Sequence, residues 1–104
     1  MAQIHPNAVV EEGAILGEHT KIGAFAFIGS HVVLKDHVEI MQGAGIYGDT
    51  VIDEGTKIYP YAIIGMPPQD IGYKPEDDVK VRIGKNNVIR EFVTINAGTH
   101  HGNG

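Results

Sequence analysis

The sequence predicts an all-β protein, a parallel β-helix shaped like a three-sided prism, and two observations indicate this class. First, an aliphatic residue occupies every sixth position from residue 4 to residue 64. Second, the residue four places after each of the first ten aliphatics is small or β-branched. Helical faces recur every 3.6 residues or so and half-buried strands every two, so neither explains a period of six. Short strands joined at corners, each with one inward aliphatic side chain, do explain it.

The aliphatic positions give the expected strands in order. Three sides make one coil, and successive coils stack at a strand spacing of about 4.8 Å. Strands are expected around residues 4, 10 and 16 in the first coil, around 22, 28 and 34 in the second, around 40, 46 and 52 in the third, and around 58 and 64 in the fourth. Ile and Val suit such flat pleated surfaces. The pattern resumes at Ile83, Ile89 and Ile95.

The corners between strands need unusual backbone angles. Gly, Asn, Asp and His are enriched at positive φ, and these types dominate the third position after each aliphatic. Phe25 and Tyr61 fit that position poorly. The whole column is Asn7, Gly13, His19, Phe25, His31, His37, Gly43, Asp49, Gly55 and Tyr61.

The segment between the two runs of repeats breaks the period. Ile64 and Ile83 are nineteen residues apart, one more than three repeats. The segment holds three of the five prolines and the run Glu-Asp-Asp at 76–78. Because proline cannot donate to a sheet ladder, we expect an extruded loop insertion over residues 66–82. Long loops on a rigid scaffold often carry binding groups.

The length and composition of the chain argue against several classes of protein. The length of 104 residues predicts a single domain, 1–104, and the net charge of −5 argues against nucleic-acid binding. The sequence shows no signal peptide and no apolar run long enough for membrane insertion, so we expect a cytoplasmic protein. Without cysteine the chain has neither a disulfide nor a thiol nucleophile. The final residues contain no polar cap for a stacked array, so we expect the amino-terminal part of a longer enzyme.

Three stretches resemble one family. They are "IHPNAVV" at 4–10, "IGMPPQDIGYK" at 64–74 and "IREFVTINAGT" at 89–99. Together they resemble the UDP-N-acetylglucosamine acyltransferases, which are hexapeptide-repeat proteins. The resemblance covers the whole chain. It implies a left-handed parallel β-helix, a homotrimer and active sites in clefts between neighbouring prisms.

The resemblance also implies a reaction. A 3-hydroxyacyl group would pass from acyl carrier protein to the 3-hydroxyl of UDP-N-acetylglucosamine, the first step of lipid A biosynthesis. The acyl donor is carried on the phosphopantetheine of acyl carrier protein, and no other cofactor and no metal is implied. The family's general base is a histidine in a later motif that this sequence does not contain, so we expect no catalytic residue in this span and no activity from it alone. His100 and His101 precede that motif and do not take its place.

The same resemblance indicates substrate-binding residues. Gln69 and Asp70 match loop residues that reach the sugar and its phosphates, and an amide and a carboxylate suit sugar hydroxyls. Gly72 stands where many relatives have lysine, and Lys74 could replace that contact. Asn96 stands where others carry histidine. The expected substrate-binding set is Gln69, Asp70, Tyr73, Lys74, Arg90 and Asn96.

Alternatives stay open at this point. Five of the eight basic residues lie between 74 and 90, where they could dock an anionic nucleotide or acidic carrier protein, or simply balance nearby acids. His19 and His37 are expected to stack on adjacent coils, and a hexapeptide-fold carbonic anhydrase binds zinc through histidines. We favour an exposed histidine ladder.

A third possibility is a truncated β-helix fragment that folds without catalysing a reaction. Tyr47, Phe25 and Phe27 are expected to be wall residues that contact a neighbouring prism.

Overall fold

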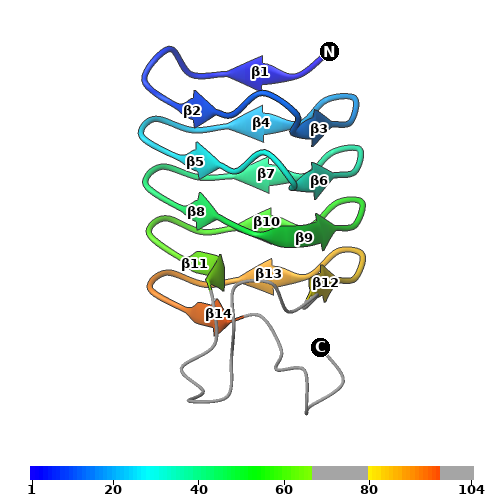
Figure 1. Ribbon diagram of the computed structural model, residues 1–104, viewed down its shortest axis with the longest axis vertical. Coiled ribbons are helices and arrows are strands. Elements are labelled where there is room, and N and C mark those ends of the chain that lie inside the picture. Colours follow the sequence, from blue (N-terminus) through cyan, green and yellow to red (C-terminus); the bar gives the residue numbers. More distant parts are fainter. Residues whose placement is uncertain (67–79, 97–104) are drawn as a thin grey trace.

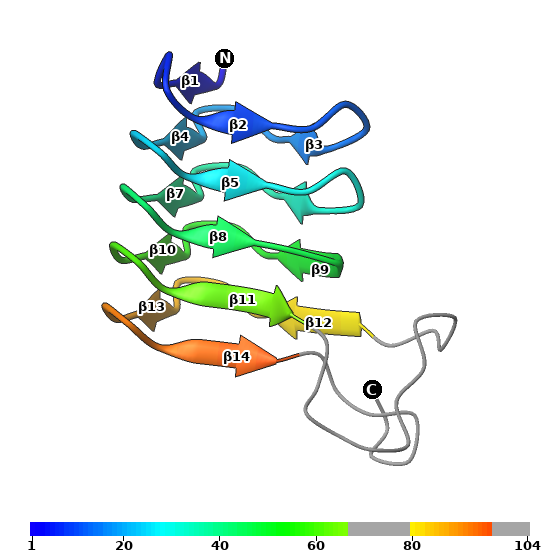
Figure 2. The ribbon, with the colours of Figure 1, turned by 60° about the vertical axis from the view of Figure 1, so that its left-hand side comes forward.

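The computed structural model describes residues 1–66 and 80–96, and they form a parallel β-helix (Figures 1 and 2). The first sheet contains β1 (Gln3–Ile4), β4 (Lys21–Ile22), β7 (Glu39–Ile40), β10 (Lys57–Ile58) and β13 (Val88–Ile89). The second sheet contains β2 (Val9–Val10), β5 (Phe27–Ile28), β8 (Gly45–Ile46), β11 (Ile63–Met66) and β14 (Thr94–Asn96). The third sheet contains β3 (Ile15–Leu16), β6 (Val33–Leu34), β9 (Asp49–Ile52) and β12 (Lys80–Ile83). The predicted prism is confirmed.

Each inward aliphatic lies directly beside its equivalent in the next coil. All strand pairs are parallel, and Ile22, for example, has Ile4 and Ile40 as its register partners. The register is restored after the break in the period, because Ile83 pairs with Ile52 and Ile95 pairs with Ile64. The expected restart of the repeat is therefore confirmed.

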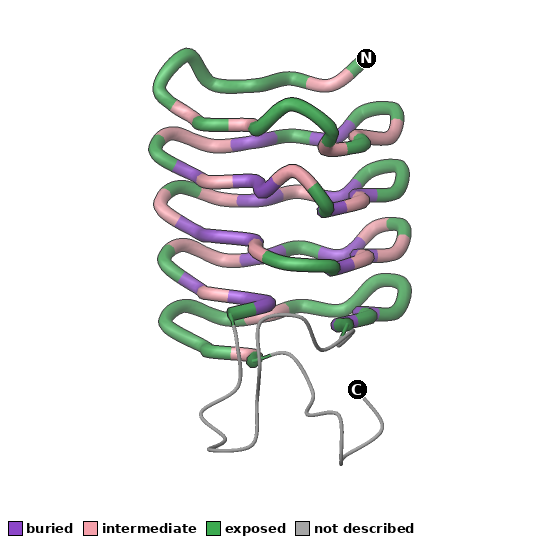
Figure 3. The backbone as a smooth tube through the Cα atoms, viewed as in Figure 1, coloured by how far each residue is buried: buried purple, intermediate pink, exposed green. Residues whose placement is uncertain are grey.

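The core is the interior of the prism, and it is best sealed in the middle coils (Figure 3). Ile28, Ile46, Ile52, Ile58 and Ile64 are fully buried. Burying a side chain of this size contributes about 1.5–3 kcal/mol. In the first coil the interior is more open, since Ile4 is 47% exposed.

Buried threonines share the interior with the aliphatics. Thr20, Thr50 and Thr56 are completely buried, and each hydroxyl donates to a main-chain carbonyl at a corner. The Thr56 hydroxyl donates to the Gly84 carbonyl at 2.6 Å and accepts the Asn87 amide at 3.1 Å. These hydroxyls satisfy corner backbone groups that short strands leave unpaired.

The corners correct one sequence expectation. Phe25 and Tyr61 do adopt positive φ, at 61° and 63°, although their type was expected to fit poorly. Asn7 and His31 are not among the residues with positive φ, and Asp49 begins β9 because the chain turns one residue earlier, at Gly48. Corner geometry is thus imposed by stacking of the coils rather than by residue type at each position.

The boundaries of the expected insertion differ from 66–82. Met66 ends β11, and residues 80–82 belong to β12, where Val81 and Ile83 point inward and are almost fully buried. The remaining residues of that insertion, 67–79, lie outside the described residues. Within the described part of the chain, no helix is long and apolar enough to cross a membrane.

Candidate functional site

Two of the six expected substrate-binding residues can be placed. Arg90 and Asn96 both lie on the last described coil, and both are exposed. Gln69, Asp70, Tyr73 and Lys74 lie outside the described residues. The site is therefore built from Arg90, Asn96 and the wall around them.

Asn96 ends β14 beside the end of β11. Its register partner is Met66, and the register shifts between Ile64 and Met66. Met66 directly precedes the segment that contains Gln69 and Asp70. Asn96 therefore stands where the chain leaves the wall toward those two residues, and its amide can both donate and accept hydrogen bonds.

The corner after the second sheet is shaped by two glycines. Gly48 and Gly65 have φ of 65° and 90°, and a β-carbon on Gly48 would lie 2.9 Å from the Gly65 carbonyl oxygen. A β-carbon on Gly65 would collide with the Tyr47 carbonyl oxygen, which already accepts the Thr50 hydroxyl at 2.7 Å. At both glycines the space that a β-carbon would need is taken by the chain's own main chain, and Gly65 is buried, so two successive coils approach each other closely at this corner.

Arg90 is held by two neighbours at a different corner. Its guanidinium carbon lies 4.5 Å from the centroid of the Tyr59 ring, in the preceding coil. Its Nε donates to the Glu91 carboxylate at 3.1 Å. The pKa of Glu91 is lowered, first by a hydrogen bond from its own backbone amide and then by the bond from Arg90. Arg90 follows the first sheet whereas Asn96 ends the second, so the structure places them at separate corners.

The basic residues between 74 and 90 do not form one patch among the described residues. Lys80 and Arg82 alternate with the inward residues of β12 and so face outward from the third sheet. Lys85 lies at the corner between the third and first sheets, in an open depression of about 330 Å³. The depression is lined by Lys35, Asp36, Asp53, Glu54 and Lys85. The three carboxylates there favour charge balancing for Lys85.

The histidines stack as expected. The rings of His19 and His37 are nearly parallel, with centroids 5.0 Å apart, and both residues are exposed. Across residues 1–66 and 80–96, no three His, Asp or Glu side chains gather as metal ligands.

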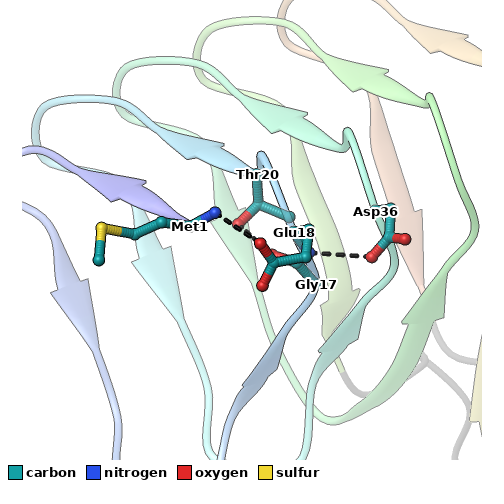
Figure 4. A network of polar contacts seen from close by, with 5 residues as sticks. All are labelled: Met1, Gly17, Glu18, Thr20 and Asp36. Atoms are coloured by element: carbon teal, nitrogen blue, oxygen red, sulfur yellow. Dashed lines mark hydrogen bonds and ion pairs between the residues drawn. The ribbon is translucent and has the colours of Figure 1, made fainter.

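A polar network at the amino-terminal end joins three coils of the corner between the third and first sheets (Figure 4). The Met1 ammonium lies 2.7 Å from the Glu18 carboxylate, and the Glu18 amide donates to Asp36 at 2.9 Å. The hydrogen bond and the charge of the terminal ammonium lower the pKa of Glu18. This network consists of exposed groups and lies at the opposite end of the prism from Asn96 (Figure 1).

Sequence reasoning missed a second depression, of about 620 Å³, on the outer wall of the first sheet. It lies where Gly23 stands between His5 and Met41 in the column that follows the inward aliphatics. A β-carbon at Gly23 would lie 2.8 Å from the Gln42 amide nitrogen, so two coils approach each other closely beside this depression.

Comparison with known proteins matches both the sequence and the fold. Residues 1–30 match the family model described as bacterial transferase hexapeptide (six repeats). The whole chain is 49% identical to 40% of the acyl-[acyl-carrier-protein]–UDP-N-acetylglucosamine O-acyltransferase of Campylobacter concisus. It therefore spans about 40% of the length of the curated relatives it matches.

Solved structures agree with the sequence match. The UDP-N-acetylglucosamine acyltransferase from Bacteroides fragilis has a TM-score of 0.92 and 40% identity over 97% of this chain and 39% of its own. The enzyme from Campylobacter jejuni has a TM-score of 0.89 and 48% identity over 98% of this chain and 39% of its own. The fold is the left-handed β-helix of hexapeptide repeats, as expected.

Proposed function

We propose that this chain, similar along its whole length to the amino-terminal portion of UDP-N-acetylglucosamine O-acyltransferases, supplies the sugar-facing part of such an enzyme's site. The reaction moves a 3-hydroxyacyl group from acyl carrier protein to the 3-hydroxyl of UDP-N-acetylglucosamine. It is the first step of lipid A biosynthesis. The observation that carries the proposal is 49% identity over all 104 residues, together with a TM-score of 0.92 to a solved enzyme.

Gln69 and Asp70 bind the nucleotide sugar in this proposal. A carboxylate accepts hydrogen bonds from sugar hydroxyls, and an amide can donate to a hydroxyl or a phosphate oxygen as well as accept. Tyr73 and Lys74 follow on the same segment, and Lys74 takes the phosphate contact that a lysine at position 72 makes in many relatives. Asn96 is exposed beside the end of β11, and it supports a substrate position next to this segment because its amide can both donate and accept hydrogen bonds.

Arg90 supplies a second, separate anion contact. Tyr59 and Glu91 hold its guanidinium in place, so less side-chain entropy is lost when an anion binds. Its position at another corner of the prism fits a contact with substrate bound to a neighbouring copy. In the proposed homotrimer each substrate lies between two prisms, and Arg90 of one copy contacts the substrate bound to the next.

The sequence contains no counterpart of the family's general-base histidine, so the chain alone binds without catalysing transfer. The enzyme is cytoplasmic in this proposal, as the similarity to these acyltransferases suggests. Its partners are UDP-N-acetylglucosamine, acyl carrier protein and two further copies of the chain. The acyl donor arrives on phosphopantetheine, and no cofactor is bound by the prism itself.

The test is acyl transfer by a chimaera. Residues 1–104 replace the matching portion of the Campylobacter concisus enzyme, and product formation from 3-hydroxyacyl carrier protein and UDP-N-acetylglucosamine is followed by mass. We expect the chimaera to form acylated product and the isolated 104-residue chain to form none. Transfer by the isolated chain, or a folded chimaera without activity, would contradict the proposal.

A further inference from the structure

Two basic side chains stand side by side on the outer wall of the third sheet. Lys80 and Arg82 are exposed, and along β12 they alternate with Val81 and Ile83, which are buried. A strand rises about 3.3 Å per residue, so the two outward positions are about 6.6 Å apart. Because the inward pair is buried, the strand cannot turn over, and both cations stay on the outer side of the wall.

The position of Lys80 links this pair to the proposed substrate-binding segment. Met66 ends β11 and Lys80 begins β12, so the chain leaves the wall after the first residue and has returned to it at the second. The two strands are in contact, and the corner between the second and third sheets lies between them. Lys80 is therefore the first described wall residue that follows Gln69 and Asp70 in the chain.

The backbone that carries the two cations is firmly paired. All four residues of β12 are in register with β9, with Lys80 beside Asp49 and Arg82 beside Val51. Most strands of this prism are only two residues long, so the third sheet is extended where the two cations stand. A binding group on a rigid strand is held more precisely than one on a loop.

Only part of the positive charge of this pair is neutralised by neighbours. Asp49 is exposed beside Lys80, whereas the residues stacked in register on Arg82 are Val51 and then Val33. Across residues 1–66 and 80–96, neither Lys80 nor Arg82 has a carboxylate oxygen within 4.0 Å. The pair therefore leaves a net positive charge on this wall, in a chain whose net charge is −5.

This arrangement suits a phosphate ligand. A guanidinium donates two parallel hydrogen bonds to phosphate oxygens, and an ammonium adds a point charge on a flexible stem. In the nucleotide sugar of the proposed function, the diphosphate is attached directly to the sugar. A sugar bound beside the end of β11 thus places its phosphates near the corner at which β12 begins.

We propose that Lys80 and Arg82 bind the diphosphate of the nucleotide sugar. The inference rests on the proposed function and adds two wall residues to the contact assigned to Lys74. The phosphopantetheine of the acyl donor also carries a phosphate. The pair adjoins the ends of the sugar-binding segment, however, and this position favours the nucleotide. Asp49 opposes the contact, because its carboxylate offsets part of the charge of the pair.

The test measures binding of UDP and of uridine to the chimaera by calorimetry. The two ligands differ only in the diphosphate, so the ratio of their dissociation constants reports that group and is insensitive to a general loss of folded protein. In Lys80→Gln/Arg82→Gln we expect the preference for UDP to fall by at least about tenfold, as when charged hydrogen bonds are lost. Lys57→Gln, at an exposed lysine of the first sheet, is the matched control and should keep the full preference.

A second variant should change the same ratio in the opposite direction. Asp49→Asn removes the carboxylate beside Lys80, so we expect tighter binding of UDP and unchanged binding of uridine. Misfolding cannot produce a gain in affinity for one ligand alone. Unchanged or weaker binding of UDP by Asp49→Asn would contradict a diphosphate at this position.

Two further results would overturn the proposal. One is a preference for UDP that the double variant retains or that the unchanged chimaera lacks. The other is a double variant that binds UDP normally but binds 3-hydroxyacyl carrier protein less tightly, because the pair would then serve the phosphopantetheine. Binding is measured without turnover. A chimaera that binds UDP through these residues but transfers no acyl group would therefore refute the proposed reaction and leave this inference standing.

Discussion

Ile83 lies directly beside Ile52 in the third sheet, although this pair interrupts the regular spacing of the chain. Other register partners on that sheet, such as Leu34 and Ile52, are eighteen residues apart, whereas Thr56 and Asn87, just beyond the pair, are thirty-one apart. The interior therefore returns to the same aliphatic column after the interruption. Stability and function can be tested separately because this column is buried, whereas Arg90 and Asn96 are exposed.

A charged side chain in the column of inward aliphatic residues should unfold the chain. Ile46 is completely buried, so Ile46→Asp places a carboxylate in an interior that offers it no cationic partner among the described residues. An unpaired buried charge costs several kcal/mol, enough to unfold a domain of this size. We expect loss of the β-sheet circular dichroism signal at 25 °C. Ile46→Val should cost only about 1 kcal/mol, and native stability in the aspartate variant would show that the residue is not inward.

The close approach of two coils at Gly65 can be tested with alanine. Gly65→Ala combines positive φ with a collision against the Tyr47 carbonyl oxygen, so we expect a loss of about 1–3 kcal/mol in the free energy of unfolding. Gly84→Ala is the matched control, because its nearest neighbour would be the Asn87 side-chain nitrogen at 3.5 Å. It should change stability by less than about 0.5 kcal/mol. Equal effects from the two changes, measured by urea unfolding, would argue against a special backbone at Gly65.

The hydroxyl of Thr56 should contribute to stability through its hydrogen bonds in addition to the volume that the side chain fills. Thr56→Val keeps the volume but leaves the Gly84 carbonyl and the Asn87 amide without their partner. Gly84 and Asn87 are exposed, so water can solvate them in the variant, and each lost hydrogen bond should cost about 0.5–1.5 kcal/mol. Thermal unfolding should show a lower midpoint than for Thr20→Val, which loses a single hydrogen bond to Gly17. The reverse order would contradict the role assigned to Thr56.

The terminal network predicts a pH effect with a defined sign. The Met1 ammonium lowers the pKa of Glu18 in the folded state. This pair therefore stabilises the fold at pH values above the pKa of Glu18 in the unfolded chain, which is near 4.5. The contribution disappears as the pH falls through the lower, folded pKa. Acetylating the terminal amine should raise the pKa of Glu18, measured by NMR titration, and leave that of Glu91 unchanged. A Glu18 pKa that acetylation does not move would exclude the terminal charge as the cause.

The period of six predicted which residues point into the interior, because each inward position needs an aliphatic side chain. The column from Ile4 to Ile64 and its restart at Ile83 were read from spacing alone, and both are confirmed. Corner residues were harder to predict, since coil stacking imposes positive φ on Phe25 and Tyr61 against the preference of their type. The shorter turn at Gly48 could not be predicted from the sequence, because it leaves the spacing of the aliphatics unchanged.

The surroundings of Arg90 could not be predicted from the sequence in the same way. Tyr59 contacts it from the preceding coil, across the interrupted segment, so no fixed spacing links the two residues. The basic residues after position 74 were close in sequence, yet the coil carries Arg82, Lys85 and Arg90 to different sides of the prism. Linear clustering indicates a surface patch only where the chain does not turn corners between the residues.

The central claim is that this chain contributes sugar-binding residues, with Asp70 foremost, to an acyltransferase site. The most direct measurement compares transfer rates of the chimaera carrying Asp70→Ala or His101→Ala at a fixed concentration of UDP-N-acetylglucosamine below its KM. We predict that Asp70→Ala lowers kcat/KM for the nucleotide sugar by at least about tenfold, as expected when a hydrogen bond involving a charged group is lost, and that His101→Ala leaves it within twofold. A chimaera in which His101→Ala abolishes transfer while Asp70→Ala remains fully active would contradict the account.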